Sequence, residues 1–112
     1  MVEVKWMPRA QKDLEEIWNH IALDSMRYAD ETVLRLTDST LVLREHPRLG
    51  KPVPQLGLPD LRELLVRDYR VVYWLEHEDL LHVLTVHRQE RLRDPKGLLR
   101  STRALRRSSK EE

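Results

Sequence analysis

Three runs of sequence decide the fold of this chain: LRELLV at residues 61–66, YRVVYWL at 69–75 and LLHVLTVHR at 80–88. Each run is rich in the β-branched, aromatic and aliphatic residues that favour strands. Only Arg67-Asp68 separates the first two runs, and a polar segment at 76–79 separates the second from the third. Such short polar breaks predict a meander of three antiparallel strands.

The predicted meander carries several arginines and histidines within its strands. An arginine in a strand is seldom fully buried without a partner, so several on one small sheet predict that one face of the sheet is solvated. We expect that face to be concave and basic. It would then suit an anionic ligand such as RNA, because arginines bind phosphate oxygens.

A helical hairpin is predicted upstream of the meander. Pro8 is tolerated in a first helical turn, and after it apolar residues recur at helical spacing up to Ala22. Asp24 and Ser25 then interrupt the pattern and offer an N-cap side chain for a second helix. This second helix is expected to end at His46-Pro47, since the residue before a proline is pushed out of helical geometry. Its inward stripe is expected to be Ala29, Val33, Leu36, Thr40 and Leu43.

The remaining segments complete an α+β fold. Apolar and polar residues alternate over residues 2–6, which predicts a half-buried strand. Residues 48–59 are rich in glycine and proline and are predicted to be a connecting loop. Two helices joined so closely run antiparallel and must bury their apolar stripes against each other or a sheet. The predicted order is therefore β-α-α-β-β-β, with a two-helix hairpin packed on a small, mainly antiparallel sheet.

Length and composition restrict the class of protein. The chain has 112 residues, enough for a single core, with 40% hydrophobic and 35% charged residues. It has no cysteine, which excludes disulfides and thiolate chemistry. No apolar run approaches the roughly 20 residues of a membrane span. We expect a cytoplasmic protein that does not bind membranes.

Charge is distributed unevenly along the chain. Residues 88–110 contain nine Lys or Arg and two Asp or Glu, a net charge of +7, whereas everything before residue 88 has a net charge of −4. A basic end on a mildly acidic body is typical of proteins that contact nucleic acids or acidic partners. A solvated tail with no such role would have the same composition.

Four short motifs in this order resemble one known superfamily. They are DLEEI at 13–17, PRLG at 47–50, LREL at 61–64 and YRVVY at 69–73. Together with the predicted element order, they resemble the RelE/ParE superfamily of bacterial toxins, the plasmid stabilisation protein family, over roughly residues 1 to 92. We expect a toxin domain over residues 1–93 and a basic extension over 94–112, either a short helix or disordered.

The resemblance implies the toxin of a type II toxin–antitoxin module. Such a toxin is inactive in a hetero-oligomer with its cognate antitoxin, part of which wraps around it. In the RelE-like branch the toxin cleaves messenger RNA on the ribosome, with the 2′-hydroxyl attacking the neighbouring phosphate. We expect this function first: an endoribonuclease that needs no metal and no cofactor.

The resemblance also assigns candidate residues to this chemistry, which asks for positive charge over the phosphate and for groups that move protons. Arg70, the arginine of YRVVY, and Arg67, just before the turn, are expected to hold the phosphate. His87, at the end of the last strand, is the candidate acid or base, although a surface histidine is an equal interpretation. Glu63 is more readily explained by an ion pair with a neighbour such as Arg62. Further expected RNA contacts are Arg62, Arg88, Arg91 and Trp74, the last by stacking on a base.

Two departures from the nuclease pattern keep other functions open. No aromatic residue follows Trp74, and the loop has Val53 and Gln55 where histidine-based nucleases of the superfamily tend to carry a glutamate. The alternative is a ParE-like poison of DNA gyrase, a binding inhibitor in which the same residues are contacts. A third alternative is a degenerate toxin that has lost its activity and still binds the antitoxin.

Overall fold

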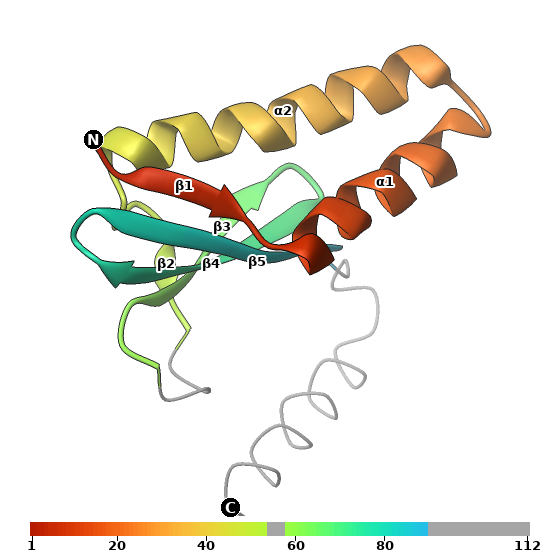
Figure 1. Ribbon diagram of the computed structural model, residues 1–112. Coiled ribbons are helices and arrows are strands. Elements are labelled where there is room, and N and C mark those ends of the chain that lie inside the picture. The colour runs from red at the N-terminus through yellow and green to blue at the C-terminus, as the bar shows by residue number, and fades with distance from the viewer. Residues whose placement is uncertain (54–57, 90–112) are drawn as a thin grey trace, which may run out of the picture.

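The computed structural model describes residues 1–53 and 58–89, and within these ranges it forms two layers (Figure 1). A hairpin of two helices lies over one face of a five-stranded sheet, so the predicted α+β fold is confirmed. In chain order the elements are β1 (Glu3–Trp6), α1 (Pro8–Ala22), α2 (Met26–Glu45), β2 (Lys51–Pro52), β3 (Leu61–Val66), β4 (Tyr69–His77) and β5 (Leu80–Arg88).

The sheet has the strand order β1-β5-β4-β3-β2. Strands β3, β4 and β5 form the predicted antiparallel meander. Strand β1 runs parallel to β5, with Val4 opposite Leu81, so segments from the two ends of the domain lie side by side (Figure 1). Strand β2, which pairs Lys51 with Glu63, lies inside the segment expected to be loop. That expectation was wrong there, because two residues are too few to show a strand period.

The helix boundaries follow from local chemistry. Pro8 occupies the start of α1, where its missing N–H has no helical partner to lose. The Ser25 hydroxyl oxygen accepts the backbone N–H of Tyr28 at 3.1 Å and caps α2, as predicted. Helix α2 ends at Glu45, directly before His46-Pro47. Across the hairpin, Trp18 Nε1 donates to Asp30 Oδ1 at 2.8 Å and joins α1 to α2.

The core lies between the hairpin and the sheet. Four of the five residues expected on the inward stripe of α2 are buried: Ala29, Leu36, Thr40 and Leu43. Opposite them, buried side chains of β4 and β5 complete the core, namely Val71, Tyr73, Leu75, Leu81, Val83 and Val86. Among the described residues, no helix is long and apolar enough to cross a membrane.

The loop after α2 is attached to the core through Tyr73. Its hydroxyl donates to the carbonyl of Pro47 at 2.7 Å and accepts the backbone N–H of Gly50 at 2.9 Å. A Cβ atom at Gly50 would lie 2.7 Å from the carbonyl oxygen of Glu63 and 2.8 Å from the Tyr73 hydroxyl. Glycine at this position therefore allows the loop to approach the sheet closely.

Candidate functional site

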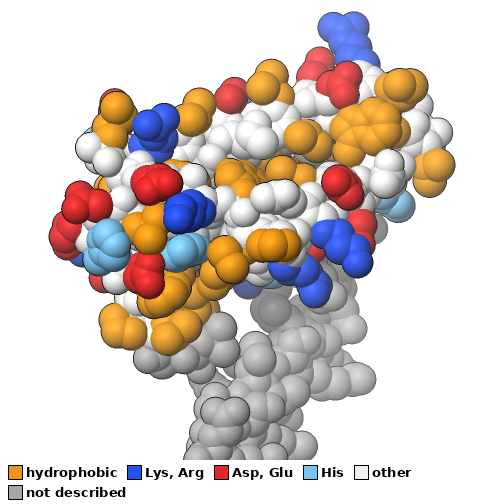
Figure 2. Space-filling model, in the orientation of Figure 1, with side chains coloured by type: hydrophobic (Ala, Val, Ile, Leu, Met, Phe, Trp, Pro, Cys, Tyr) orange, Lys and Arg blue, Asp and Glu red, His pale blue; other side chains and the backbone are white. Residues whose placement is uncertain are grey.

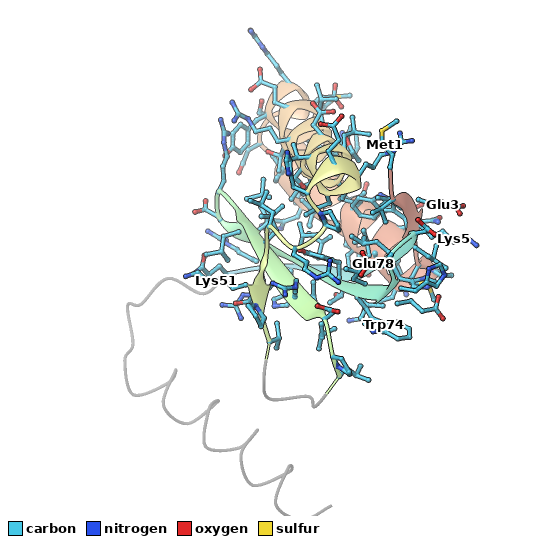
Figure 3. All side chains as sticks on the ribbon, turned by 90° about the vertical axis from the view of Figure 1, so that its left-hand side faces the viewer. Met1, Glu3, Lys5, Lys51, Trp74 and Glu78 are labelled. Atoms are coloured by element: carbon cyan, nitrogen blue, oxygen red, sulfur yellow. The ribbon has the colours of Figure 1, made fainter. Side chains whose placement is uncertain are left out.

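The face of the sheet that points away from the helices carries three of the expected site residues, Arg70, Trp74 and His87. Cross-strand pairing places Arg70 opposite His87 and Trp74 opposite His82, and directly opposite residues share a face. Figure 3 shows the Trp74 side chain on the side of the sheet away from the helices. We call this surface the open face.

Four expected residues gather where the β3–β4 turn meets the end of β5. Arg67 is exposed in the turn, Arg70 and His87 are cross-strand neighbours on the open face, and Arg88 lies opposite Tyr69 on the helix side of the sheet. The turn and the strand end are joined because the backbone N–H of Gln89 donates to the carbonyl of Asp68 at 2.6 Å. We call Arg67, Arg70, His87 and Arg88 the basic end.

Arg70 already has an acidic neighbour. Its Nε lies 3.3 Å from Glu63 Oε2, an ion pair whose geometry falls short of a hydrogen bond. The ion pair expected for Glu63 therefore forms, with Arg70 rather than Arg62 as its partner. The expectation of a basic open face was wrong in this respect, because the face carries charges of both signs. Register explains the pairing: Glu63 is opposite Val72, which puts it diagonal to Arg70.

Arg62 lies apart from the basic end. It is opposite Tyr73, on the helix side of the sheet, and its side chain is only 17% exposed. Its guanidinium donates to the carbonyl of Gly50 at 2.9 Å and to that of Arg48 at 3.3 Å. It also donates to Asp60 Oδ1 at 3.4 Å. Arg62 therefore holds the loop between α2 and β3 in place.

Trp74 belongs to a second cluster on the open face, near the β4–β5 turn. Its ring stacks on that of His82, with centroids 5.6 Å apart and the planes 23° from parallel. His82 Nε2 lies 2.9 Å from Glu76 Oε2, and the bond from His82 lowers the pKa of Glu76, with smaller contributions from His77 and Lys5. Figure 2 shows histidine, basic and acidic side chains together at this end of the sheet. Arg91, expected as an RNA contact, lies outside the described residues, as do the expected domain boundary at 93 and the extension.

A polar hollow of about 290 Å³ adjoins the basic end on the helix side. Tyr28, Asp68, Tyr69 and Arg88 contribute to its walls. Burial raises the pKa of the Tyr69 phenol, and the nearby Arg88 guanidinium lowers it by less. Tyr69 therefore keeps its proton at neutral pH and remains a hydrogen-bond donor.

Asp13 makes the most constrained polar contact between α1 and the sheet. Its side chain is buried in the first half of the helix, and Oδ2 accepts the Thr85 hydroxyl at 2.6 Å and the Val86 backbone N–H at 3.0 Å. Oδ1 accepts Arg9 Nε at 3.2 Å. Burial raises the pKa of Asp13, but the hydrogen bonds from Thr85, Val86 and Arg9 outweigh it, so the pKa lies below the ordinary 3.8.

Asp13 was noted from the sequence only as the first residue of the DLEEI motif, with no role of its own. The sequence did contain a signal for this contact: Asp13 follows Ala10 by three residues, so an acidic side chain occupies a position on the apolar stripe of α1. Within residues 1–53 and 58–89, no group of three or more histidine, aspartate or glutamate side chains is placed to hold a metal ion.

Comparison with known proteins identifies the family. Residues 4–93 match the family described as ParE toxin of type II toxin–antitoxin system, parDE. Because the match spans most of the chain, this protein belongs to that family, which confirms the expected superfamily and makes it a type II toxin with a cognate antitoxin as partner.

A solved structure supports the fold. A chain of the chromosomal ParDE toxin–antitoxin system from P. aeruginosa superposes with a TM-score of 0.67 and is 21% identical. The alignment covers 80% of this chain and 98% of that chain. A comparison with curated proteins found no match.

Proposed function

We propose that this toxin is a ParE-like poison of DNA gyrase, which binds its target and traps the DNA-cleavage complex without doing chemistry itself. The match of residues 4–93 to the ParE toxin family is the observation that carries the proposal. The basic end is then a contact surface. Arg67 and Arg88 are both exposed and frame that surface.

The Arg70–Glu63 ion pair supports a binding role over a catalytic one. A nuclease that stabilises a developing phosphorane needs positive charge aimed at the phosphate before the reaction. In this toxin Glu63 lies 3.3 Å from the Arg70 guanidinium and offsets its charge. An ion pair of this kind is compatible with a contact surface, because a partly exposed pair contributes little free energy and can exchange partners.

Ribonuclease activity is the second candidate, and one observation favours it. Arg70 and His87 are directly opposite each other on adjacent strands, so a phosphate-binding group and a proton carrier share one face. For cleavage, Arg70 would release Glu63 and bind the phosphate, while His87 would exchange a proton with the ribose hydroxyl or the leaving oxygen.

The two functions are separated by incubating the purified chain with gyrase, ATP and plasmid DNA, and in parallel with a translating extract. We expect linear plasmid after denaturation and protease treatment, and intact message in the extract. Arg67→Ala and Arg88→Ala should weaken trapping, whereas Arg44→Ala, an exposed arginine at the far end of α2, should not. Cleaved message with unbroken plasmid, or no effect in either assay, would overturn the proposal.

A further inference from the structure

Strand β5 loses its parallel neighbour before it ends. Strand β1 accompanies it only as far as Trp6, opposite Val83, and the Met7 N–H then donates to the Val83 carbonyl at 3.0 Å. Strand β5 continues to Arg88. Along this stretch α1 replaces β1, and Asp13 accepts the backbone N–H of Val86. The Asp13 carboxylate thus satisfies a strand donor where β1 has stopped.

The same stretch of β5 contains an irregularity. Val72 is opposite Thr85, but the next residue of β4, Tyr73, is opposite Val83, so Leu84 is an extra residue in β5. A bulge of this kind bends a strand and redirects the side chains that follow it. Asp13 binds the two residues immediately after Leu84, through the hydroxyl of Thr85 and the N–H of Val86.

We infer that Asp13 is a positioning residue for the basic end. It holds the bulged strand from α1 and so sets the direction in which the side chains of the next two residues, His87 and Arg88, project from the sheet. The carboxylate suits this task because it is buried, accepts three hydrogen bonds and belongs to a helix packed on β5. The inference rests on the proposed function only in taking His87 and Arg88 as target contacts.

Amide hydrogen exchange tests the positioning directly, without any target. In Asp13→Ala we expect the amides of Val86 to Gln89 to exchange about 10- to 100-fold faster, as the loss of a charged hydrogen bond implies. Asp13→Asn should restore much of the protection, because an amide oxygen can accept the bonds of Thr85 and Val86. Asp38→Ala, an exposed aspartate of α2, is the matched control and should change nothing at β5. Equal acceleration throughout the sheet would show general destabilisation and overturn the inference.

A double-mutant cycle tests the consequence for toxicity. The readout is the induction level that arrests bacterial growth, which does not depend on whether gyrase or the ribosome is the target. At equal amounts of soluble protein, we expect Asp13→Ala to raise this induction level about tenfold. In a variant that already carries His87→Ala and Arg88→Ala, adding Asp13→Ala should change the induction level little, because the effects of residues that act through one another are not additive. Losses that simply add would overturn the inference. Failure of the wild type to trap gyrase would refute the proposed function alone, leaving both of these readouts valid.

Discussion

Replacing Tyr73 by phenylalanine should destabilise the toxin well beyond the loss of one oxygen atom. Tyr73 is fully buried, and its hydroxyl serves both the Pro47 carbonyl and the Gly50 N–H. The phenylalanine ring would fill the same space and leave both backbone groups without their partner. An unsatisfied buried group costs roughly 1–3 kcal/mol. The Gly50 N–H is buried and the Pro47 carbonyl partly buried, so the loss of both bonds should lower the free energy of unfolding by about 2–4 kcal/mol.

Urea unfolding followed by tryptophan fluorescence and circular dichroism would measure this loss. The dependence of the unfolding free energy on urea should stay unchanged, because the same surface is exposed on unfolding. Tyr69→Phe is the matched control: Tyr69 is a half-buried tyrosine at the start of the same strand. We expect it to change stability by less than about 0.5 kcal/mol.

A loss below about 1 kcal/mol in Tyr73→Phe would refute this reasoning, since it would mean that water or a shifted loop satisfies Pro47 and Gly50 equally well. Equal losses in Tyr73→Phe and Tyr69→Phe would refute it as well. In either case the attachment of the loop to the core would have to come from Arg62 instead.

Other predictions concern single contacts and use the same unfolding assay. Ser25→Ala should cost about 1 kcal/mol by removing the cap of α2, and a change within error would argue against that cap. Arg67 adopts φ +54°, a left-handed conformation, so Arg67→Gly should stabilise by about 0.5–1 kcal/mol, whereas a loss would show that its side chain contributes packing. The lowered pKa of Asp13 contributes stability that is present above its ordinary pKa of 3.8 and is lost as the pH falls through and below that value. Between about pH 5 and about pH 2, the wild type should therefore lose more stability than Asp13→Asn, and parallel curves would contradict this assignment.

Much of the fold was predictable because its signals are local. The Ser25 cap, the stop at His46-Pro47 and the alternation within the meander each arise from neighbouring residues. The two-residue strand β2 was missed because its pairing depends on β3 and not on its own sequence. The inward stripe of α2 was predictable for the same reason, because the helical spacing of its apolar residues lies within one continuous segment.

The site was less predictable because its contacts are distant in sequence. Arg67, Arg70, His87 and Arg88 lie at one end of the sheet, and strand register places Arg70 with His87 on one face and Arg88 on the other. The partner of Glu63 depends on strand register, which fixes a diagonal neighbour that the sequence pattern does not reveal. The contact between Asp13 and Thr85 joins residues 72 positions apart and depends on where β1 stops.

The parallel pairing of β1 with β5 has a kinetic consequence. Glu3 pairs with Leu80, so this edge of the sheet forms only when residues far apart in the sequence meet. The β3–β5 meander, in contrast, can form from segments that are adjacent in the sequence. Contacts between distant segments form late, because the chain must lose loop entropy first. Asp13 can bind β5 only once the end of that strand has been synthesised. The contact of Asp13 with β5 is therefore added late in folding, after the meander that carries the basic end.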